Sequence, residues 1–218
     1  MTGVSLNINK KKSNVILGKE TRCIGGVEFL EDELCGIKFR ISPASFYQVN
    51  HAQTEKLYTL VKEFADLCGK ETVYDLYCGV GTIGLTLAKQ ADSIIGIETV
   101  RDAVENAREN AKRNGIKNAE YIEGAAEEIL GGGFDKGDFK RPDVVIVDPP
   151  RKGCDEKLLN SILLAKPKKI VYVSCDPATL ARDLKILCRE DYEIKRIRPV
   201  DCFCETVHVE TVCLMEPT

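Results

Sequence analysis

One short segment restricts the fold of this 218-residue chain more than any other: a strand-like run that leads directly into a glycine-rich turn. The run covers residues 72–77, and the turn that follows reads Gly79-Val80-Gly81-Thr82-Ile83-Gly84. Glycines at this spacing allow a sharp turn and a close approach of the backbone to a bound ligand. The segment therefore predicts a strand, a turn and a helix of a parallel sheet, with Gly79 and Gly81 at a ligand site.

Strand and helix patterns alternate through the rest of the chain, which predicts an α/β fold. Two extended runs with no helix between them, at 193–198 and 206–214, predict an antiparallel pair at one edge of the sheet. We expect a Rossmann-like fold with a mostly parallel seven-stranded sheet and an antiparallel C-terminal hairpin, a layout like that of S-adenosylmethionine-dependent methyltransferases. The remaining strands are expected at 72–77, 93–98, 120–122, 143–147 and 169–174, and helices at 82–89, 101–114, 155–164 and 178–188.

The first 42 residues carry a different pattern, in which short alternating apolar runs are separated by glycines. These runs lie near residues 6–8, 15–17, 27–30 and 37–41. They predict a small antiparallel β meander, which has too few strands to bury a core of its own. We therefore expect a small β subdomain at 1–42, the remnant of a central domain, and a catalytic domain at 43–218.

Two further segments are assigned from local signals. Asn50 and Gln53 can form a capping box ahead of apolar residues at helical spacing, which predicts a helix at 51–68. The glycine-rich segment 131–140 is expected to be a surface loop.

The charge and cysteine content exclude several classes of protein. The 31 Lys and Arg residues are balanced by 34 Asp and Glu residues, so nucleic acid can be bound only through a local patch. Ten cysteines are scattered through the chain without a CxxC pair, and there is no long apolar run or signal segment. We expect a cytoplasmic protein with reduced thiols, no metal site and no membrane contact.

Acidic residues near the glycine turn bear on the choice of cofactor. Glu98 ends the next strand and can accept hydrogen bonds from a ribose. Asp75, just before the turn, would repel the pyrophosphate of a nicotinamide dinucleotide but suits the ammonium group of S-adenosylmethionine. These residues favour S-adenosylmethionine as the cofactor. The alternative interpretations are that Asp75 only caps the nearby helix and that Glu98 is only a solvated residue at the end of a strand.

A second loop at the same sheet edge reads Asp148-Pro149-Pro150-Arg151. The prolines fix the backbone and end the strand ladder, so the loop is expected to be stiff and to lie over the cofactor site. Methyltransferases that act on amino groups carry an aromatic residue after such a motif. Arg151 in that place disfavours exocyclic nitrogen as the target, and a purely structural turn is the alternative.

Cys175 follows the strand at 169–174 and precedes a helix. Its place at the ligand edge of the sheet, where a helix begins, favours a thiolate, whereas most cysteines are inert buried thiols. A thiolate beside a methyl donor suits carbon 5 of a pyrimidine, which becomes nucleophilic only after a thiolate has added to carbon 6. A base must then remove the proton from carbon 5, and Glu210 is a carboxylate in an otherwise apolar strand. Solvation at a sheet edge is the alternative interpretation of Glu210.

Five segments together resemble the RNA (uracil-5-)-methyltransferase family, which makes 5-methyluridine in ribosomal or transfer RNA. The resemblance extends from about residue 7 to residue 217. The segments are Ser45-Phe46-Tyr47-Gln48-Val49-Asn50, Asp75-Leu76-Tyr77-Cys78-Gly79, Val147-Asp148-Pro149-Pro150-Arg151, the run from Tyr172 to Leu184, and His208-Val209-Glu210.

The resemblance implies roles for six residues. Cys175 would be the nucleophile and Glu210 the proton-abstracting base. Gln48, Tyr77, Glu98 and Asp148 would contact S-adenosylmethionine; of these, Gln48 and Tyr77 are identified by the resemblance alone.

The chain departs from the family pattern in two places. A Phe-Pro-His-Thr run usually precedes the His-x-Glu segment, whereas this chain has Phe203-Cys204-Glu205-Thr206. The asparagine usual after the nucleophile is Asp176 here, which can cap the helix.

Family members usually carry an N-terminal RNA-binding domain, so we expect this chain to be the catalytic part of a longer protein. The resemblance favours 23S ribosomal RNA over transfer RNA as the substrate, with the uridine flipped out or in a loop. The sequence indicates no protein partner. The alternatives are a non-catalytic S-adenosylmethionine- or RNA-binding module and a nicotinamide oxidoreductase on the same sheet.

Overall fold

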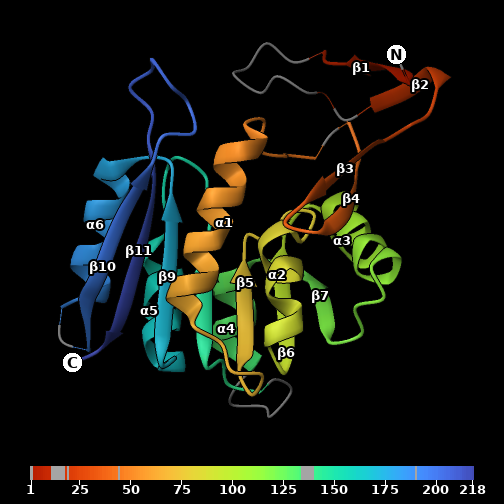
Figure 1. The fold of residues 1–218 in the computed structure, drawn as a ribbon. Coiled ribbons are helices and arrows are strands. Elements are labelled where there is room, and N and C mark those ends of the chain that lie inside the picture. The colour runs from red at the N-terminus through yellow and green to blue at the C-terminus, as the bar shows by residue number, and fades with distance from the viewer. Residues whose placement is uncertain (1, 11–17, 19, 44, 134–139, 190) are drawn as a thin grey trace.

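The computed structural model describes residues 2–10, 18, 20–43, 45–133, 140–189 and 191–218. Its main feature is a seven-stranded sheet in the order β10-β11-β9-β8-β5-β6-β7 (Figure 1). The pairs formed by β5, β6, β7, β8 and β9 are parallel, while β11 runs antiparallel to both β9 and β10. The strands are β5 (Thr72–Leu76), β6 (Ser93–Glu98), β7 (Ala119–Glu123), β8 (Val144–Val147), β9 (Lys169–Ser174), β10 (Tyr192–Val200) and β11 (Glu210–Pro217).

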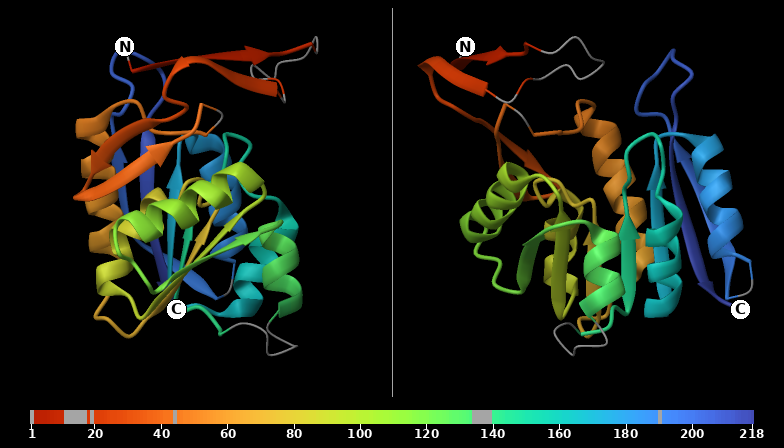
Figure 2. Two further views of the ribbon diagram at one scale, coloured as in Figure 1. Left: turned by 90° about the vertical axis from the view of Figure 1, so that its right-hand side faces the viewer. Right: turned by 180° about the vertical axis from the view of Figure 1, so that it is seen from behind.

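Helices cover both faces of this sheet and make a three-layer arrangement (Figures 1 and 2). One apolar cluster lies between the sheet and the helices α1, α2 and α3, and a second lies between the sheet and α4, α5 and α6. The helices are α1 (His51–Ala65), α2 (Thr82–Leu87), followed by the short 3-10 helix Ala88–Gln90, α3 (Arg101–Arg113), α4 (Ala126–Gly133), α5 (Glu156–Ala165) and α6 (Pro177–Leu187). No helix in the described part of the chain is long and apolar enough to cross a membrane.

The predicted α/β fold, with a mostly parallel sheet and an antiparallel C-terminal pair, is confirmed. Asn50 also caps α1 as predicted, because its side chain accepts a hydrogen bond from the main-chain N–H of Gln53. One helix departs from the prediction. Residues 126–133 form α4, although Gly131 and its neighbours indicated a loop, because Ala126 and Leu130 bury their side chains in the second apolar cluster. Tertiary packing here outweighs the low helix propensity of glycine.

The N-terminal strands form two separate hairpins instead of one meander. β1 (Gly3–Ile8) pairs with β2 (Glu20–Gly26), and β3 (Leu30–Leu34) pairs with β4 (Ile37–Ile41). The strand expected at 15–17 lies outside the described residues. The β1–β2 hairpin stands apart from the main body, at the end of the molecule where the parallel strands finish (Figure 2).

The β3–β4 hairpin packs on the main body through apolar and polar contacts. Leu34, Ile37 and Phe39 are buried in the same cluster as α1. From α3, the side chain of Asn110 bonds the main-chain N–H and carbonyl of Arg40, at 2.7 and 3.2 Å. The hairpin therefore shares an apolar core with the sheet, and a side chain of α3 bonds the main-chain groups of Arg40 at the edge of the hairpin.

Candidate active site

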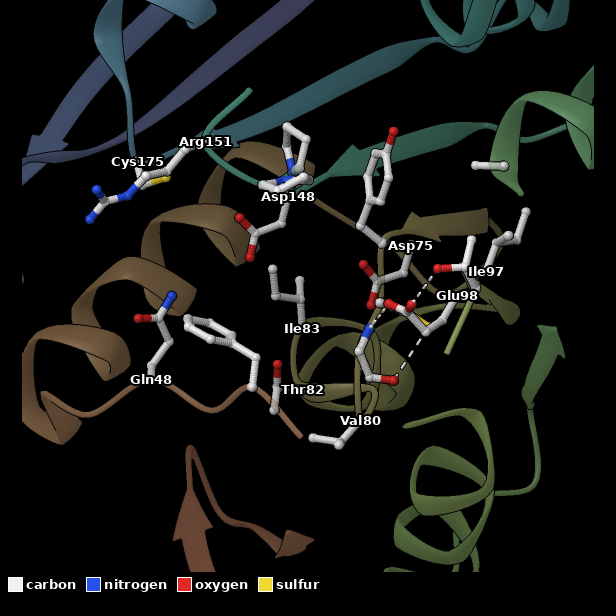
Figure 3. A pocket seen from close by; sticks show the side chains of 18 of the residues that line it. Gln48, Asp75, Val80, Thr82, Ile83, Ile97, Glu98, Asp148, Arg151 and Cys175 are labelled. Atoms are coloured by element: carbon white, nitrogen blue, oxygen red, sulfur yellow. Dashed lines mark hydrogen bonds between the residues drawn. The ribbon is translucent and has the colours of Figure 1, made fainter. Parts of the chain in front are cut away.

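A cavity of about 680 Å³ opens at the edge of the sheet where β5, β6, β8 and β9 end (Figure 3). The segment before α1 and the loop between β10 and β11 complete its walls. Ligands of open α/β sheets bind at this edge. Seven of the site residues expected from the sequence line it: Gln48, Tyr77, Gly79, Glu98, Asp148, Cys175 and Glu210.

The eighth expected residue, Gly81, is not among the residues that line the cavity, and it packs against Tyr121 instead. A Cβ added to Gly81 would lie 2.6 Å from the hydroxyl of Tyr121, and its φ is +81°. Gly79 has a φ of +54° and lines the cavity, with nothing within 4 Å of a Cβ built there. The backbone at Gly79 is therefore open to a ligand, whereas Gly81 is needed for the conformation and packing of the turn.

Tyr77 precedes the turn with a φ of +62°. A bulky side chain in the left-handed region is strained, and such strain concentrates at functional sites. Its backbone conformation singles out Tyr77, and the sequence pattern carries no signal for this conformation.

Glu98 is held beside the turn by main-chain donors. One carboxylate oxygen accepts from the N–H of Gly79 at 3.1 Å, and the other accepts from the N–H of Val100 at 2.9 Å. The carboxylate therefore has a fixed position at the end of β6, where an acidic residue can accept hydrogen bonds from the hydroxyls of a ribose.

Asp75 is a buried carboxylate with one unsatisfied oxygen. Oδ2 accepts from the N–H of Gly84 at 2.8 Å, while Oδ1 has no hydrogen-bond partner among the described residues. Burial, together with the charge of Glu98, raises the pKa of Asp75 to about 7. Because Asp75 lines the cavity, a donor on a bound ligand can satisfy Oδ1. This arrangement fits a ligand that bears an ammonium group.

Asp148 adds a further carboxylate at the end of β8. Burial, followed by the charges of Glu210 and Asp75, raises the pKa of Asp148 to about 8. The cavity thus contains acidic groups from β5, β6 and β11 and from the end of β8. A cationic ligand would offset their mutual repulsion, and an anionic one would increase it.

Cys175 lies in the short connection between β9 and α6. Asp176 caps α6 by accepting from the N–H groups of Ala178 and Thr179, at 2.9 and 3.0 Å. Burial and the charges of Glu210 and Asp148 raise the pKa of the Cys175 thiol, and Arg151 opposes them. Burial and the nearby carboxylates therefore act against the thiolate that the helix terminus was expected to favour.

Glu210 is brought to Cys175 by the register of β11. Thr211 pairs with Ser174, so Glu210 lies at the end of β9 where Cys175 follows. The residue is 3% exposed, and burial raises the pKa of its carboxyl while Arg151 opposes this effect. Nucleophile and base expected from the sequence thus lie in the same cavity.

Figure 3 shows how these groups divide the cavity. Gln48, Cys175 and Arg151 lie toward one end, and Asp75 and Glu98 lie toward the other. The arrangement provides one region for a cofactor at the glycine turn and another for a substrate at the thiol.

The structure adds lining residues that the sequence pattern did not identify. Tyr58 of α1 lines the cavity and donates a hydrogen bond of 2.8 Å to the hydroxyl of Thr82. The helical periodicity of α1 gives no signal for this role, since Tyr58 falls beside core positions. Phe46, which belongs to a segment already identified from the sequence, also lines the cavity and is 75% exposed.

Comparisons with known proteins agree with this geometry. A family model described as tRNA (uracil-5-)-methyltransferase matches residues 18–218. An uncharacterized RNA methyltransferase of Clostridium acetobutylicum is 52% identical over 214 residues, which are 98% of this chain and 46% of that protein. Another from Enterococcus faecalis is 52% identical over 209 residues, or 96% of this chain and 45% of that protein. The chain spans slightly less than half the length of these relatives.

Solved structures show the same likeness. The tRNA (uracil-54, C5)-methyltransferase of Pyrococcus abyssi, in complex with S-adenosyl-L-homocysteine, matches with a TM-score of 0.80 and 36% identity. The match covers 98% of this chain and 50% of that one. A tRNA m1G37 methyltransferase from M. jannaschii matches with a TM-score of 0.66 at 15% identity, over 91% of this chain and 60% of that one, which is a likeness of fold.

Proposed function

The chain belongs to the tRNA (uracil-5-)-methyltransferase family, and from this premise we propose that it transfers a methyl group from S-adenosylmethionine to carbon 5 of a uridine in RNA. The observation that carries the proposal is the convergence of Cys175 and Glu210 on a cavity that also contains the glycine turn. Because the chain spans slightly less than half the length of the relatives it matches, the activity of the whole protein is part of the proposal.

The chain's own residues fit the cofactor. Asp75 offers an unsatisfied buried oxygen to the ammonium group, Glu98 offers its carboxylate to the ribose, and Gly79 leaves room for close backbone contact. Tyr77 and Asp148 line the same cavity, and Gln48 lies toward the end that contains Cys175. When bound, S-adenosylmethionine supplies an electrophilic methyl group.

Cys175 acts on the uracil. Carbon 5 is a poor nucleophile, and addition of the Cys175 thiolate to carbon 6 moves electron density toward carbon 5. Because its pKa is raised, the free thiol first gives up its proton to solvent water, and the thiolate then adds. The result is a covalent link between Cys175 and the base that persists until the proton on carbon 5 is removed.

Glu210 is placed to remove that proton. Burial raises the pKa of its carboxyl, which makes the carboxylate a stronger base than one in water. When the carbon–hydrogen bond breaks, its electron pair re-forms the double bond between carbons 5 and 6, and the Cys175 thiolate leaves. Glu210 and Cys175 are thereby ready for another cycle once Glu210 releases the proton.

The proposal also has to specify which class of RNA carries the uridine. The resemblance of the sequence favours 23S ribosomal RNA, while the Pyrococcus abyssi enzyme acts on transfer RNA. No described residue distinguishes the two, so the experiment must separate the RNA classes.

Nucleoside mass spectrometry of separated ribosomal and transfer RNA, from cells with and without the gene, tests the proposal. We expect loss of 5-methyluridine from one fraction and its return when the gene is restored. Restoring the gene with Cys175→Ala should not return the nucleoside, while Cys68→Ala, which removes an exposed thiol, should. An unchanged content of 5-methyluridine in both fractions would instead favour the non-catalytic binding module.

A further inference from the structure

Arg151 is a cationic side chain in a cavity where most of the charged lining residues are acidic; Lys152 next to it is the other lysine or arginine of the lining. The lining includes the carboxylates of Asp75, Glu98, Asp148 and Glu210. Arg151 is also the cation that acts electrostatically on both reacting groups, since its charge lowers the pKa of the Cys175 thiol and of the Glu210 carboxyl. Because the proposed cofactor is itself cationic, binding of the cofactor does not explain an arginine in this position.

The backbone of Arg151 is fixed relative to Cys175. Its carbonyl accepts a hydrogen bond of 3.2 Å from the hydroxyl of Thr179, on the first turn of α6. In the next turn, the guanidinium of Arg182 donates to the carbonyls of Lys152 and Cys154, at 2.9 and 3.0 Å. Since α6 starts directly after the nucleophile, the same helix fixes both the thiol and the arginine loop.

A buried carboxylate completes this attachment. Asp183 is fully buried and accepts hydrogen bonds from the N–H of Cys154 at 2.8 Å and the hydroxyl of Tyr172 at 2.6 Å. It also pairs with Arg182 at 2.7 Å. These bonds attach the backbone of the loop that carries Arg151 to β9 and α6, on either side of the nucleophile.

The guanidinium itself is not engaged in an ion pair within the described part of the chain. Its contact is with His208, whose Nε2 lies 3.4 Å from Nη2 of Arg151 and can accept a hydrogen bond when Nδ1 carries the proton. Arg151 and Cys175 lie toward the same end of the cavity in Figure 3. His208 thus orients a charged donor group that has remaining N–H groups for a ligand.

We propose that Arg151 is a catalytic residue of the uracil reaction, which donates a hydrogen bond to the oxygen on carbon 4 and stabilises the negative charge that forms there. The inference rests on the proposed function. When Sγ of Cys175 bonds to carbon 6, the electron pair of the 5,6 double bond moves between carbons 5 and 4. The pair of the carbon–oxygen double bond then moves onto that oxygen, which becomes an enolate.

The charge on this oxygen gives Arg151 a distinct task from that of Glu210. When carbon 5 bonds to the methyl group, the carbon–oxygen double bond forms again and the pair between carbons 4 and 5 makes the new bond. Glu210 acts only after this step. A fixed donor aimed at the developing anion lowers the barrier to thiolate addition, and removing one such donor typically costs about 10²- to 10³-fold in rate. The same positive charge increases the thiolate fraction of Cys175.

The test uses the complete protein and its RNA, with Arg151→Ala, Arg151→Lys and, as a matched control, Arg189→Ala, which removes an exposed arginine beyond α6. For Arg151→Ala we expect kcat for methyl transfer to fall about 10²- to 10³-fold. The pH profile of Cys175 alkylation by iodoacetamide, measured without RNA, should shift upward by about 0.5 to 1 pH unit. Arg151→Lys should restore the alkylation profile because it restores the charge, and Arg189→Ala should change neither quantity.

The outcomes separate this inference from the function it rests on. Methyl transfer that survives Cys175→Ala would overturn the proposed function. If Cys175→Ala is inactive but Arg151→Ala keeps kcat within threefold of the wild type, the inference about Arg151 alone is wrong. A rise in KM for RNA with unchanged kcat, and with a weaker salt dependence, would assign Arg151 to an RNA phosphate instead.

Discussion

The side-chain amide of Asn50 donates a hydrogen bond of 3.0 Å to the main-chain carbonyl of Cys202. The oxygen of the same side chain caps α1. Asn50 lies two residues after Gln48 in one segment that lines the cavity, and Cys202 precedes Phe203 in the loop that lines it from the C-terminal part of the chain. One side chain therefore joins two walls of the cavity that are far apart in the sequence.

Replacing Asn50 with Asp should separate these two roles. A carboxylate keeps the helix cap, but it loses the amide donor and places an acceptor against the Cys202 carbonyl. We expect a loss of about 1 to 2 kcal/mol in the free energy of unfolding and a several-fold rise in KM for RNA. Urea unfolding and steady-state kinetics measure the two effects. Gln53→Ala, which leaves both contacts of Asn50 in place because its main-chain N–H remains, is the control; equal losses in the two variants would contradict the role of Asn50.

Glu210→Gln should trap the covalent link between protein and RNA. The amide occupies nearly the same space but cannot take the proton from carbon 5, so Cys175 cannot be released. Intact-mass analysis after incubation with RNA and S-adenosylmethionine should show an adduct, absent from the double variant that also carries Cys175→Ala. Continued turnover of Glu210→Gln with no adduct would show that another group is the base.

Cofactor binding should depend on pH because Asp75 and Asp148 have pKa values raised by burial to about 7 and about 8. Below these values the carboxyls are largely neutral, and they ionise as the pH rises from 6 to 8.5. A bound cation favours the ionised forms, so the Kd for S-adenosylmethionine should fall about 3- to 10-fold over this range. S-adenosylhomocysteine lacks the sulfonium charge and should show a smaller change.

Calorimetry in two buffers of different ionisation enthalpy measures the protons released on binding. Asp75→Asn keeps an acceptor for the N–H of Gly84 but has no charge to change, so it should reduce both the pH dependence and the proton release. A pH-independent Kd in the wild type would show that these carboxyls do not ionise on binding.

The sequence predicts the parts of this site that depend on local order along the chain. The glycine turn and Cys175 each follow a strand and Glu98 ends one, and the carboxyl ends of parallel strands meet at one edge. Glu210 lies on an antiparallel strand, and only its pairing with β9 brings it to the thiol. Periodicity cannot reveal that register.

Other features arise from contacts between distant segments. The left-handed backbone of Tyr77 has no sequence signal, and Gln48 is identified only through resemblance to a family. The raised pKa of Cys175 also depends on Glu210 and Asp148, which come from other strands. The helix next to the cysteine favours the thiolate, whereas these carboxylates oppose it, and the order of residues in the sequence does not reveal them.

Asn110 connects the β3–β4 hairpin to the glycine turn, and its loss should affect stability and cofactor binding together. The residue is fully buried; besides its two bonds to Arg40, its amide donates to the carbonyl of Val80 at 3.3 Å. Asn110→Ala leaves these main-chain groups without partners in a buried place and should lower the free energy of unfolding by about 2 to 4 kcal/mol. Asn114, one helical turn away, makes a similar but exposed contact with Lys38 and does not reach the turn, so Asn114→Ala should cost about 1 kcal/mol. Chemical unfolding and S-adenosylmethionine titration of both variants at 15 °C measure the difference. If the folded Asn110→Ala protein binds the cofactor as tightly as Asn114→Ala, the hairpin does not support the glycine turn.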